Sequence, residues 1–266
     1  MAPSPSDPLR PVIALGSRLR LCRNVATLGV KPNFNDYSAR DRERIRQAPK
    51  IYYPSAFYAD LFDAVGKATF PSYHTYKCAQ DKIRQSALFN LLGLPHPRTR
   101  VFYGRRWLKK VPGEFKFPFI AKIPRGSALG RGVFLIRDLK DLAEYHRNTD
   151  VAYIQDYLPA RRDIRVVIIG GTVAHAYWRV GAPGEFRNNV SLGGSIELND
   201  VPGAAVELAC SAAQRCGWDD VGLDVLPYKN EYYLLEANMN YGREGFRAAG
   251  LNYPRILEDM IDQGKI

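Results

Sequence analysis

The chain of 266 residues is poor in the side chains that build metal centres and disulfides, with four cysteines and four histidines. No two of them show the spacing typical of metal ligands, and a chain of this length does not need disulfides to fold. We interpret the cysteines as small buried side chains and expect no zinc site. No Ser–His or Cys–His combination indicates a protein nucleophile.

Long apolar runs are also missing. None approaches the ~20 residues that a membrane helix requires, and the polar, proline-rich residues 1–7 do not resemble a signal peptide. We therefore expect a cytoplasmic protein without a membrane partner. The chain has no internal repeat or low-complexity tract, and its length fits one large domain or two to three subdomains around a shared site.

Negative charge is scarce relative to positive charge. The formal net charge is +11, which favours anionic ligands such as nucleotides, acidic substrates or nucleic acid. A merely soluble basic surface is the alternative. Because the basic residues are dispersed rather than gathered in a stripe with aromatic residues, a nucleic-acid-binding module is disfavoured, although it stays an alternative to an enzyme.

The first third of the chain alternates between strand and helix patterns, which predicts a small α/β unit. Ser38 is a candidate N-cap, and Gly93 with Pro95 indicates a helix end. We predict strands at 12–15, 51–53 and 98–103, and helices at 38–47, 57–65 and 79–92.

The remainder is dominated by strand hairpins, so a largely antiparallel sheet is expected and a doubly wound dinucleotide fold is excluded. The two clearest hairpin turns are Gly170-Gly171 and residues 227–230. We predict strands at 117–123, 132–136, 165–169, 172–177, 221–226 and 232–237, and helices at 141–147 and 204–216.

A glycine-bearing loop at residues 124–132 carries the first chemical signal. Glycines allow backbone N–H groups to approach phosphate oxygens, and the preceding Lys122 can supply a positive charge. No Gly-Lys-Ser/Thr sequence closes the loop, which excludes a Walker loop. An ordinary glycine-rich hairpin loop remains the alternative.

Asp224, Glu236 and Asn238 form a candidate magnesium site. Residues i and i+2 of a strand point to the same face, so Glu236 and Asn238 project together, and a hairpin would bring Asp224 to that face. Two carboxylates and an amide oxygen are hard ligands suited to magnesium. Carboxylates on edge strands that face water are the alternative.

Seven short motifs between about residues 73 and 250 occur in one order and resemble the ATP-grasp superfamily. They are most similar to the RimK-like and glutathione-synthase-like carboxylate–amine ligases. The motifs are residues 81–82 with 91–99, 121–132, 154–159, 162–166, 184–195, 222–224 and 235–238.

The resemblance implies an α/β (α+β) ATP-grasp fold in which two α+β subdomains grip ATP, preceded by a small, reduced N-terminal α/β subdomain. We expect the N-terminal subdomain at 1–75 and the ATP-grasp domain at 76–266. Within the latter, a central lid-bearing subdomain is expected at about 104–157 and a metal-binding subdomain at about 158–266.

The resemblance also implies roles for individual residues. Arg187, Lys122 and Arg165 are candidate catalytic residues, and Asp224, Glu236 and Asn238 would bind two magnesium ions, with manganese as a substitute. The nucleotide-binding candidates are Lys82, Lys122, Gly126, Ser127, Gly130, Gly132, Gln155, Asp156, Tyr157, Leu158, Asp163 and Asn189. The alternatives are a solvated Lys82, an Asp163–Arg165 salt bridge and a simple basic loop residue at Arg187.

The implied reaction is ATP-dependent joining of a carboxylate to an amine through an acyl phosphate. Small-molecule or peptide substrates, preferably anionic, are the expected partners, nucleic acid is disfavoured, and homo-oligomerisation is left open. A small-molecule or protein kinase is the alternative. Ser191-Leu192 stands where RimK-like ligases have a His-Arg pair, so a glutamate-type substrate is not assigned. Asp156 stands where relatives usually have glutamate, so its contact with adenine is expected to be shorter or to pass through a water molecule.

Overall fold

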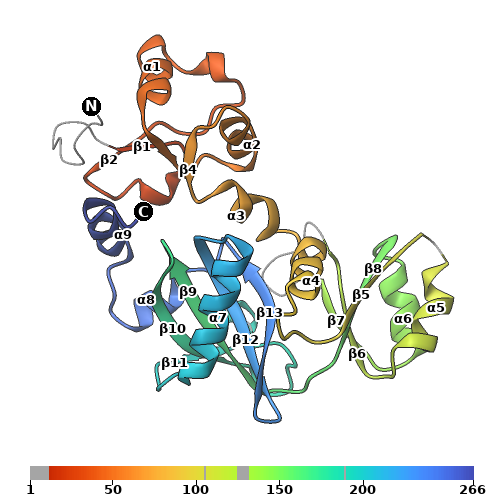
Figure 1. Cartoon of the computed structure of the whole chain (residues 1–266). Helices are drawn as coiled ribbons and strands as arrows, with labels where there is room; N and C mark the ends of the chain where they lie inside the picture. The colour runs from red at the N-terminus through yellow and green to blue at the C-terminus, as the bar shows by residue number, and fades with distance from the viewer. Residues whose placement is uncertain (1–11, 105, 125–131, 189) are drawn as a thin grey trace.

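The computed structural model describes residues 12–104, 106–124, 132–188 and 190–266, and the strands of these residues form three sheets (Figure 1). The first sheet is parallel and comes from the N-terminal part of the chain. The other two are antiparallel throughout. The mixed α/β class and the predominance of antiparallel pairing in the later part of the chain are thus confirmed.

The N-terminal sheet has the strand order β2-β1-β3-β4. Ser38 caps the first helix as expected, because its side chain accepts a hydrogen bond from the Asp41 N–H. The elements are β1 (Val12–Ala14), η1 (Ser17–Leu19), β2 (Val25–Thr27), η2 (Phe34–Asp36), α1 (Ala39–Gln47), β3 (Lys50–Tyr52), α2 (Ala56–Ala64) and β4 (Ala68–Phe70). Strands β2 and β4 were not predicted, since each contains a single large apolar residue and shows no apolar run.

A four-stranded antiparallel sheet of order β5-β8-β6-β7 follows. Its core joins side chains of the strands to those of α5 and α6, among them Trp107, Leu142 and Tyr145. The elements are α3 (Tyr73–Cys78), α4 (Lys82–Leu91), β5 (Thr99–Tyr103), α5 (Trp107–Glu114), β6 (Phe119–Lys122), β7 (Val133–Ile136), α6 (Leu139–His146) and β8 (Val151–Asp156). This sheet also includes β5, which precedes residue 104.

The predicted helix over 79–92 starts too early. The Asp81 carboxylate accepts hydrogen bonds from the N–H groups of Ile83 and Arg84, and this cap starts α4 at Lys82. Helix α5 was not predicted because Pro112 and Gly113 lie inside it.

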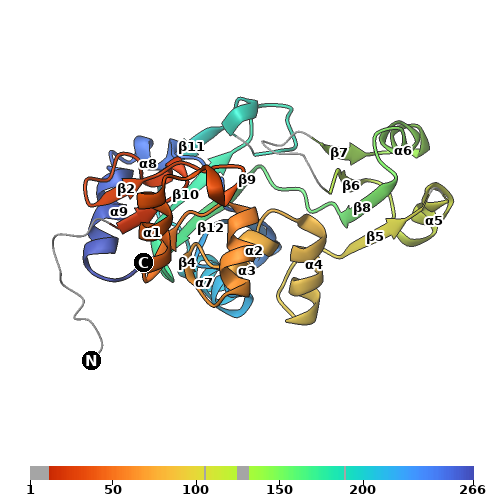
Figure 2. The same ribbon diagram turned by 90° about the horizontal axis from the view of Figure 1, so that it is seen from above.

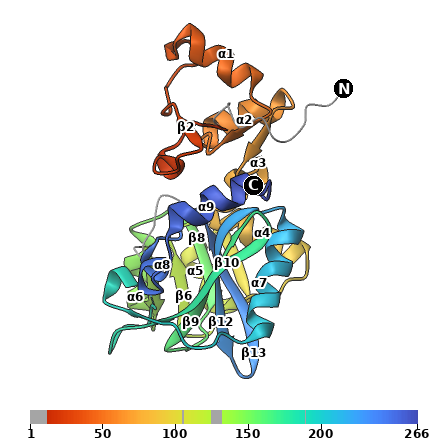
Figure 3. The ribbon, with the colours of Figure 1, turned by 90° about the vertical axis from the view of Figure 1, so that its left-hand side faces the viewer.

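The third sheet has five strands in the order β11-β10-β9-β12-β13. Helix α7 packs on one face, and α9 joins the opposite face to β1 and β3 of the N-terminal unit through one apolar cluster (Figure 3). The elements are β9 (Arg162–Ile169), β10 (Thr172–Val180), η3 (Val190–Leu192), β11 (Ser195–Glu197), α7 (Gly203–Cys216), β12 (Asp220–Tyr228), β13 (Glu231–Asn238), α8 (Glu244–Ala248) and α9 (Tyr253–Asp262).

Seen from above, the four-stranded antiparallel sheet and the N-terminal unit lie at opposite ends of the molecule (Figure 2). Both predicted hairpins are present. Gly170 and Gly171 turn β9 into β10 with φ values of 57° and 74°, and Lys229 and Asn230 turn β12 into β13. Among the described residues, no helix has the length and apolar composition that crossing a bilayer requires.

Gly222 of β12 lies where two other segments come close. A Cβ atom added there would lie 2.4 Å from the Tyr241 Cβ and 2.9 Å from the Arg165 Cδ. We expect Gly222→Ala to lower the free energy of unfolding by about 1–3 kcal/mol, the usual cost of overpacking a core, as measured by urea titration.

Gly113→Ala is the matched control, because a Cβ atom at Gly113 would meet no atom within 4 Å. Since Gly113 lies in α5, alanine should stabilise the chain by about 0.5–1 kcal/mol. Equal effects of the two substitutions would contradict the close contact at Gly222.

Candidate active site

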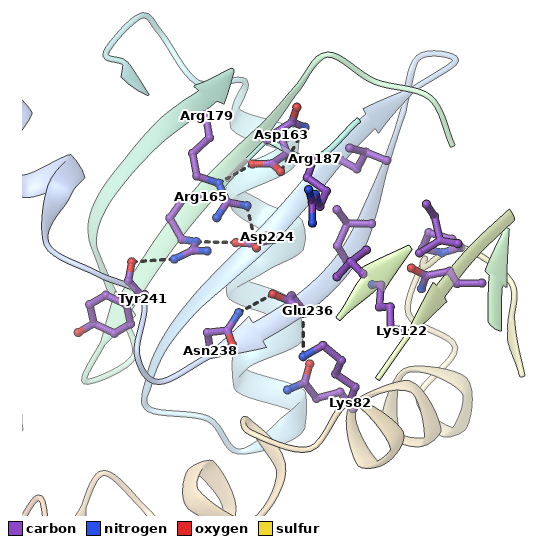
Figure 4. A pocket seen from close by; sticks show the side chains of 18 of the residues that line it. Lys82, Lys122, Asp163, Arg165, Arg179, Arg187, Asp224, Glu236, Asn238 and Tyr241 are labelled. Atoms are coloured by element: carbon purple, nitrogen blue, oxygen red, sulfur yellow. Dashed lines mark hydrogen bonds and ion pairs between the residues drawn. The ribbon is translucent and has the colours of Figure 1, made fainter. Parts of the chain in front are cut away.

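A cavity of about 720 Å³ lies between the four-stranded antiparallel sheet and the five-stranded sheet. We call it the central cavity (Figure 4). Its charged lining comes from both sheets, from the starts of α4 and α8 and from the segment after β10. It consists of Lys82, Lys122, Asp156, Asp163, Arg165, Arg179, Arg187, Asp224, Glu236 and Glu244. Charged side chains that are widely separated in the sequence therefore lie together in the central cavity.

Two lysines enter the central cavity from different elements. Lys122 ends β6 and is buried, and this burial lowers its pKa to about 8. Lys82 begins α4, where the Asp81 cap fixes the first turn, and its Nζ lies 3.6 Å from the Glu236 Oε2. Both lysines are placed to bind an anionic ligand. The negative charge of that ligand would favour the protonated form of the buried Lys122.

Glu236 and Asn238 project together into the central cavity from the end of β13 (Figure 4). The Asn238 Nδ2 donates to the Glu236 Oε1 at 2.8 Å, which leaves the amide oxygen of Asn238 available. Burial alone would raise the pKa of Glu236, but the charges of Lys82 and Lys122 hold it at about 2. Glu236 is thus ionised at neutral pH.

Asp224 lies on the adjacent strand, directly opposite Glu236 in the register of β12 and β13. Both its oxygens are engaged, one by the Arg165 Nε at 2.5 Å and the other by the Arg179 Nη2 at 2.7 Å. Glu236 and the Asn238 oxygen therefore fit a magnesium ion that takes its other ligands from water and phosphates. Each Asp224 oxygen accepts one guanidinium and keeps a second lone pair, so Asp224 can join them with its arginine partners in place.

The floor of the central cavity is a buried network of two carboxylates and two guanidiniums. The Arg179 Nε donates to the Asp163 Oδ1 at 2.7 Å, and the Arg165 Nη1 donates to the Tyr241 carbonyl at 2.8 Å. Strand register produces it, because Asp163 faces Arg179 and Arg165 faces Asp224. Burial raises the pKa of Asp163 despite the neighbouring Arg179. The network fixes a polar floor whose charges balance.

Arg187 lies in the segment that follows β10 and lines the central cavity. Its Nε and Nη2 donate to the two carboxylate oxygens of Glu185 at 2.9 and 2.7 Å, and these hydrogen bonds lower the pKa of Glu185. Arg187 is therefore held in place by a fork-shaped pair within its own loop.

A family model described as the RimK-like ATP-grasp domain matches residues 79–261, which is more than half of the chain. The chain belongs to the RimK-like ATP-grasp family. The resemblance inferred from the seven motifs is confirmed. ATP-grasp family members bind ATP, generally with magnesium.

Among curated relatives, the RimK-like chain is 31% identical over 155 residues to the coenzyme gamma-F420-2:alpha-L-glutamate ligase of Methanocaldococcus jannaschii, covering 56% of this chain and 53% of the relative. It is 32% identical over 180 residues to beta-citrylglutamate synthase B of Danio rerio, covering 64% and 44%. The chain spans about half the length of the curated relatives it matches.

Solved structures show the same fold. The crystal structure of a RimK domain ATP-grasp protein from Sphaerobacter thermophilus has a TM-score of 0.69 at 17% identity, covering 94% of this chain and 98% of that chain. The ATP-grasp ligase PsnB, solved in complex with a minimal precursor, has a TM-score of 0.68 at 17% identity, covering 96% and 98%. The expected ATP-grasp fold is confirmed.

The nucleotide-binding candidates at residues 155–158 run from the end of β8 along the wall of the central cavity. The strand ends at Asp156, so Tyr157 and Leu158 lie beyond it. Gln155 donates from Nε2 to the Thr99 Oγ1 at 2.9 Å. The Asp156 carboxylate accepts from Arg98 at 2.8 and 3.0 Å, and the Asp156 N–H donates to the Arg98 carbonyl. Asp156 is thus held by a local partner.

The RimK-like chain brings most of the sequence-predicted site residues together. Those that line the central cavity are Lys82, Lys122, Gln155, Asp156, Tyr157, Leu158, Asp163, Arg165, Arg187, Asp224, Glu236 and Asn238. Gly132 follows the glycine loop with a φ of 78°, and its carbonyl accepts a hydrogen bond from the Ile123 N–H. Gly126, Ser127, Gly130 and Asn189 lie outside the described residues.

Arg179 and Gln85 are among the residues of the site that were not predicted. Arg179 is a charge at the end of an apolar strand, and that contrast was the signal that could have identified it. Gln85 clamps β13 between Glu236 and Asn238, since it donates to the Ala237 carbonyl at 2.8 Å and accepts from the Ala237 N–H at 2.9 Å. No local pattern indicated Gln85, because its burial depends on the packing of α4 against β13. Asp163 pairs with Arg179 rather than with Arg165.

Proposed function

We propose that this RimK-like chain is an ATP-dependent carboxylate–amine ligase that acts through an acyl phosphate and releases ADP and phosphate. The observation that carries the proposal is the meeting of Lys82, Lys122, Glu236 and Asn238 in one cavity, where two ammonium groups flank hard oxygen ligands. This is the arrangement that a triphosphate with magnesium requires. The names of the curated relatives, which are ligases and synthases, support the same reaction.

In the first step, an oxygen of the substrate carboxylate attacks the γ-phosphorus of ATP, and the bond to the bridging oxygen of ADP breaks. Negative charge spreads over the phosphate oxygens. Lys122 and Lys82 would bind these oxygens, and Arg187 would stabilise the transferred group after releasing part of its contact with Glu185. Arg165 would contribute positive charge from the floor of the cavity.

In the second step, the nitrogen of the amine attacks the acyl carbon, the C–N bond forms, and phosphate leaves as the amine loses its proton. No protein nucleophile is needed. Glu236, Asn238 and Asp224 are proposed to hold two magnesium ions, for which manganese could substitute. When bound, these ions neutralise charge on the phosphates.

The remaining nucleotide contacts are proposals of the same kind. The backbone of Tyr157 and Leu158 would contact the adenine edge beside Gln155 and Asp156, and Asp163 would face the ribose. Gly126, Ser127, Gly130, Gly132 and Asn189 are proposed to border the phosphates. The residues near 104–157 would then form the lid-bearing subdomain of an ATP-grasp domain over 76–266.

The proposal is tested by trapping the acyl phosphate. Carboxylates that stimulate ADP release with magnesium are first found in a screen of amino acids, short peptides and carboxylated metabolites. Adding hydroxylamine should then yield a hydroxamate in amounts that match the ADP released, because hydroxylamine intercepts the activated acyl group.

A stable phosphoester product in place of the hydroxamate would overturn the ligase assignment and indicate a kinase. Nucleic-acid binding with a steep salt dependence and no ADP release would overturn the enzyme assignment altogether. Glu207→Gln, a change on the exposed surface of α7, serves as the control that should trap hydroxamate like the unmodified chain.

A further inference from the structure

A second hollow of about 470 Å³ lies beside the central cavity, between the N-terminal sheet and the segment after β13. We call it the N-terminal crevice. Gln80, Met239, Asn240 and Gly242 line both hollows, so the two are separated only by shared walls. A ligand in the N-terminal crevice could therefore extend toward the groups that surround Glu236.

The N-terminal crevice opens where the topology of the parallel sheet favours ligand binding. In the order β2-β1-β3-β4, the chain leaves β1 toward β2 on one side of the sheet and leaves β3 toward β4 on the other side. Ligands of parallel α/β sheets bind at the carboxyl ends of the strands at this switch point. Gly16, Ser17 and Arg18 follow β1, Tyr53 and Ser55 follow β3, and all five line the crevice.

The backbone after β3 has an uncommon conformation. Tyr53 and Ser55 have φ values of 45° and 97°, in the region that favours glycine. Such conformations of residues other than glycine gather at ligand sites. Ser55 is also the N-cap of α2, so the amino-terminal end of that helix, which favours anions, lies at the wall of the crevice.

The lining of the N-terminal crevice is positively charged. None of the described residues that line it is acidic, whereas Arg18 and Arg243 are basic. Arg18 donates three hydrogen bonds, to Tyr253, Met239 and Asn240, and the buried Asp220 raises its pKa further. The other two of its five N–H groups have no hydrogen-bond acceptor among the described residues. Arg18 thus shapes the crevice, and Asp220 offsets its charge.

Arg243 supplies the charge that is not offset. Its guanidinium lies 4.8 Å from the centre of the Tyr253 ring. Within the described ranges, no hydrogen bond or ion pair engages its side chain. The cation–π contact with Tyr253 leaves the N–H groups of Arg243 for an anion, and arginine binds a carboxylate through two such groups.

We propose that the N-terminal crevice binds a carboxylate of the substrate that does not react, with Arg243 as the anchor and Arg18 as its support. This rests on the proposed function, because the reacting carboxylate of the same molecule would lie in the central cavity. The substrate class is then a small acid with two carboxylates. Arg243 determines specificity by selecting the second carboxylate, and it takes no part in phosphoryl transfer.

The test uses glutarate, a small acid with two carboxylates, and glutaramide, its uncharged diamide. Both are titrated by calorimetry into the full chain with magnesium and a non-hydrolysable ATP analogue. Glutarate should bind at least about tenfold more tightly than glutaramide, and Arg243→Gln should remove about tenfold or more of its affinity, as expected for a charge-assisted pair.

Arg40→Gln is the matched control, because Arg40 lies on α1 with an exposed side chain and lines neither hollow. It should change glutarate affinity less than about twofold. Affinity for the ATP analogue should be equal in all three proteins. Equal binding of glutarate and glutaramide, or equal effects of the two substitutions, would overturn the crevice assignment. Failure to bind the ATP analogue, or to form a hydroxamate, would instead count against the proposed function.

Discussion

Glu236→Gln is expected to lower carboxylate-dependent ADP formation by at least about 100-fold, because magnesium contributes several kcal/mol of charge stabilisation in such sites. Glutamine keeps the shape of the side chain and can still accept the hydrogen bond from Asn238. It removes the negative charge that lies 3.6 Å from Lys82. The protein should remain folded, because the Glu236 side chain is partly exposed and Gln85 still clamps β13.

The sharper readout is the dependence of nucleotide binding on magnesium. Without magnesium, Glu236→Gln should bind the ATP analogue as tightly as the unmodified chain or more tightly, because a repulsive carboxylate is gone. With magnesium, the gain in affinity shown by the unmodified chain should disappear. Glu207→Gln should behave like the unmodified chain in both titrations. Full turnover and an unchanged magnesium effect in Glu236→Gln would contradict the metal assignment.

Asp224→Asn is expected to lower the free energy of unfolding by about 3–5 kcal/mol, the cost of removing one partner from a buried ion pair. Asp224 is 3% exposed and holds Arg165 and Arg179 at 2.5 and 2.7 Å. An asparagine retains one acceptor and places an N–H₂ group against a guanidinium. The transition measured by urea titration should shift, and the melting temperature should fall by roughly 6–20 °C.

Asp259→Asn is the control for this prediction. Asp259 also pairs with an arginine, Arg255, at 3.1 Å, but the two side chains are 43% and 56% exposed. Solvent weakens such pairs, so the unfolding free energy should change by less than about 1 kcal/mol. Equal losses in the two variants would show that the buried network on the cavity floor contributes no more to stability than a surface pair.

These two predictions assign different main roles to the two carboxylates of the proposed magnesium site, one in nucleotide chemistry and one in stability. Glu236 faces lysines and an amide and is exposed enough to exchange partners, so its loss should affect nucleotide chemistry first. Asp224 is enclosed by two guanidiniums, so its loss should affect folding first. Asp224→Asn is therefore a weaker test of metal binding than Glu236→Gln.

Local patterns in the sequence predicted much of the fold. Ser38 begins a helix because its side chain accepts an N–H group three residues away. Gly170-Gly171 and Lys229-Asn230 turn the chain because these residues adopt positive φ. Some elements that were not predicted have weak local signals, since β2 and β4 are short and α5 contains Pro112. Helix α9 was not predicted although Asn252 caps it and a proline stands in its first turn.

The sequence by itself determined the side of β13 that carries the site, since the two-residue period of a strand aligns Glu236 with Asn238 and the hairpin supplies Asp224. Only the tertiary structure decided the partners of Asp224. Arg165 and Arg179 reach it because β9 lies between β10 and β12, an order that no local pattern encodes.

The same reason applies to the N-terminal crevice. Arg18 and Arg243 are far apart in the sequence and line one hollow because α9 docks the five-stranded sheet onto the N-terminal unit. Spacing and side-chain type are local properties that a sequence displays directly. Neighbours across sheets depend on strand order and on the burial of apolar faces, which are properties of the whole folded chain.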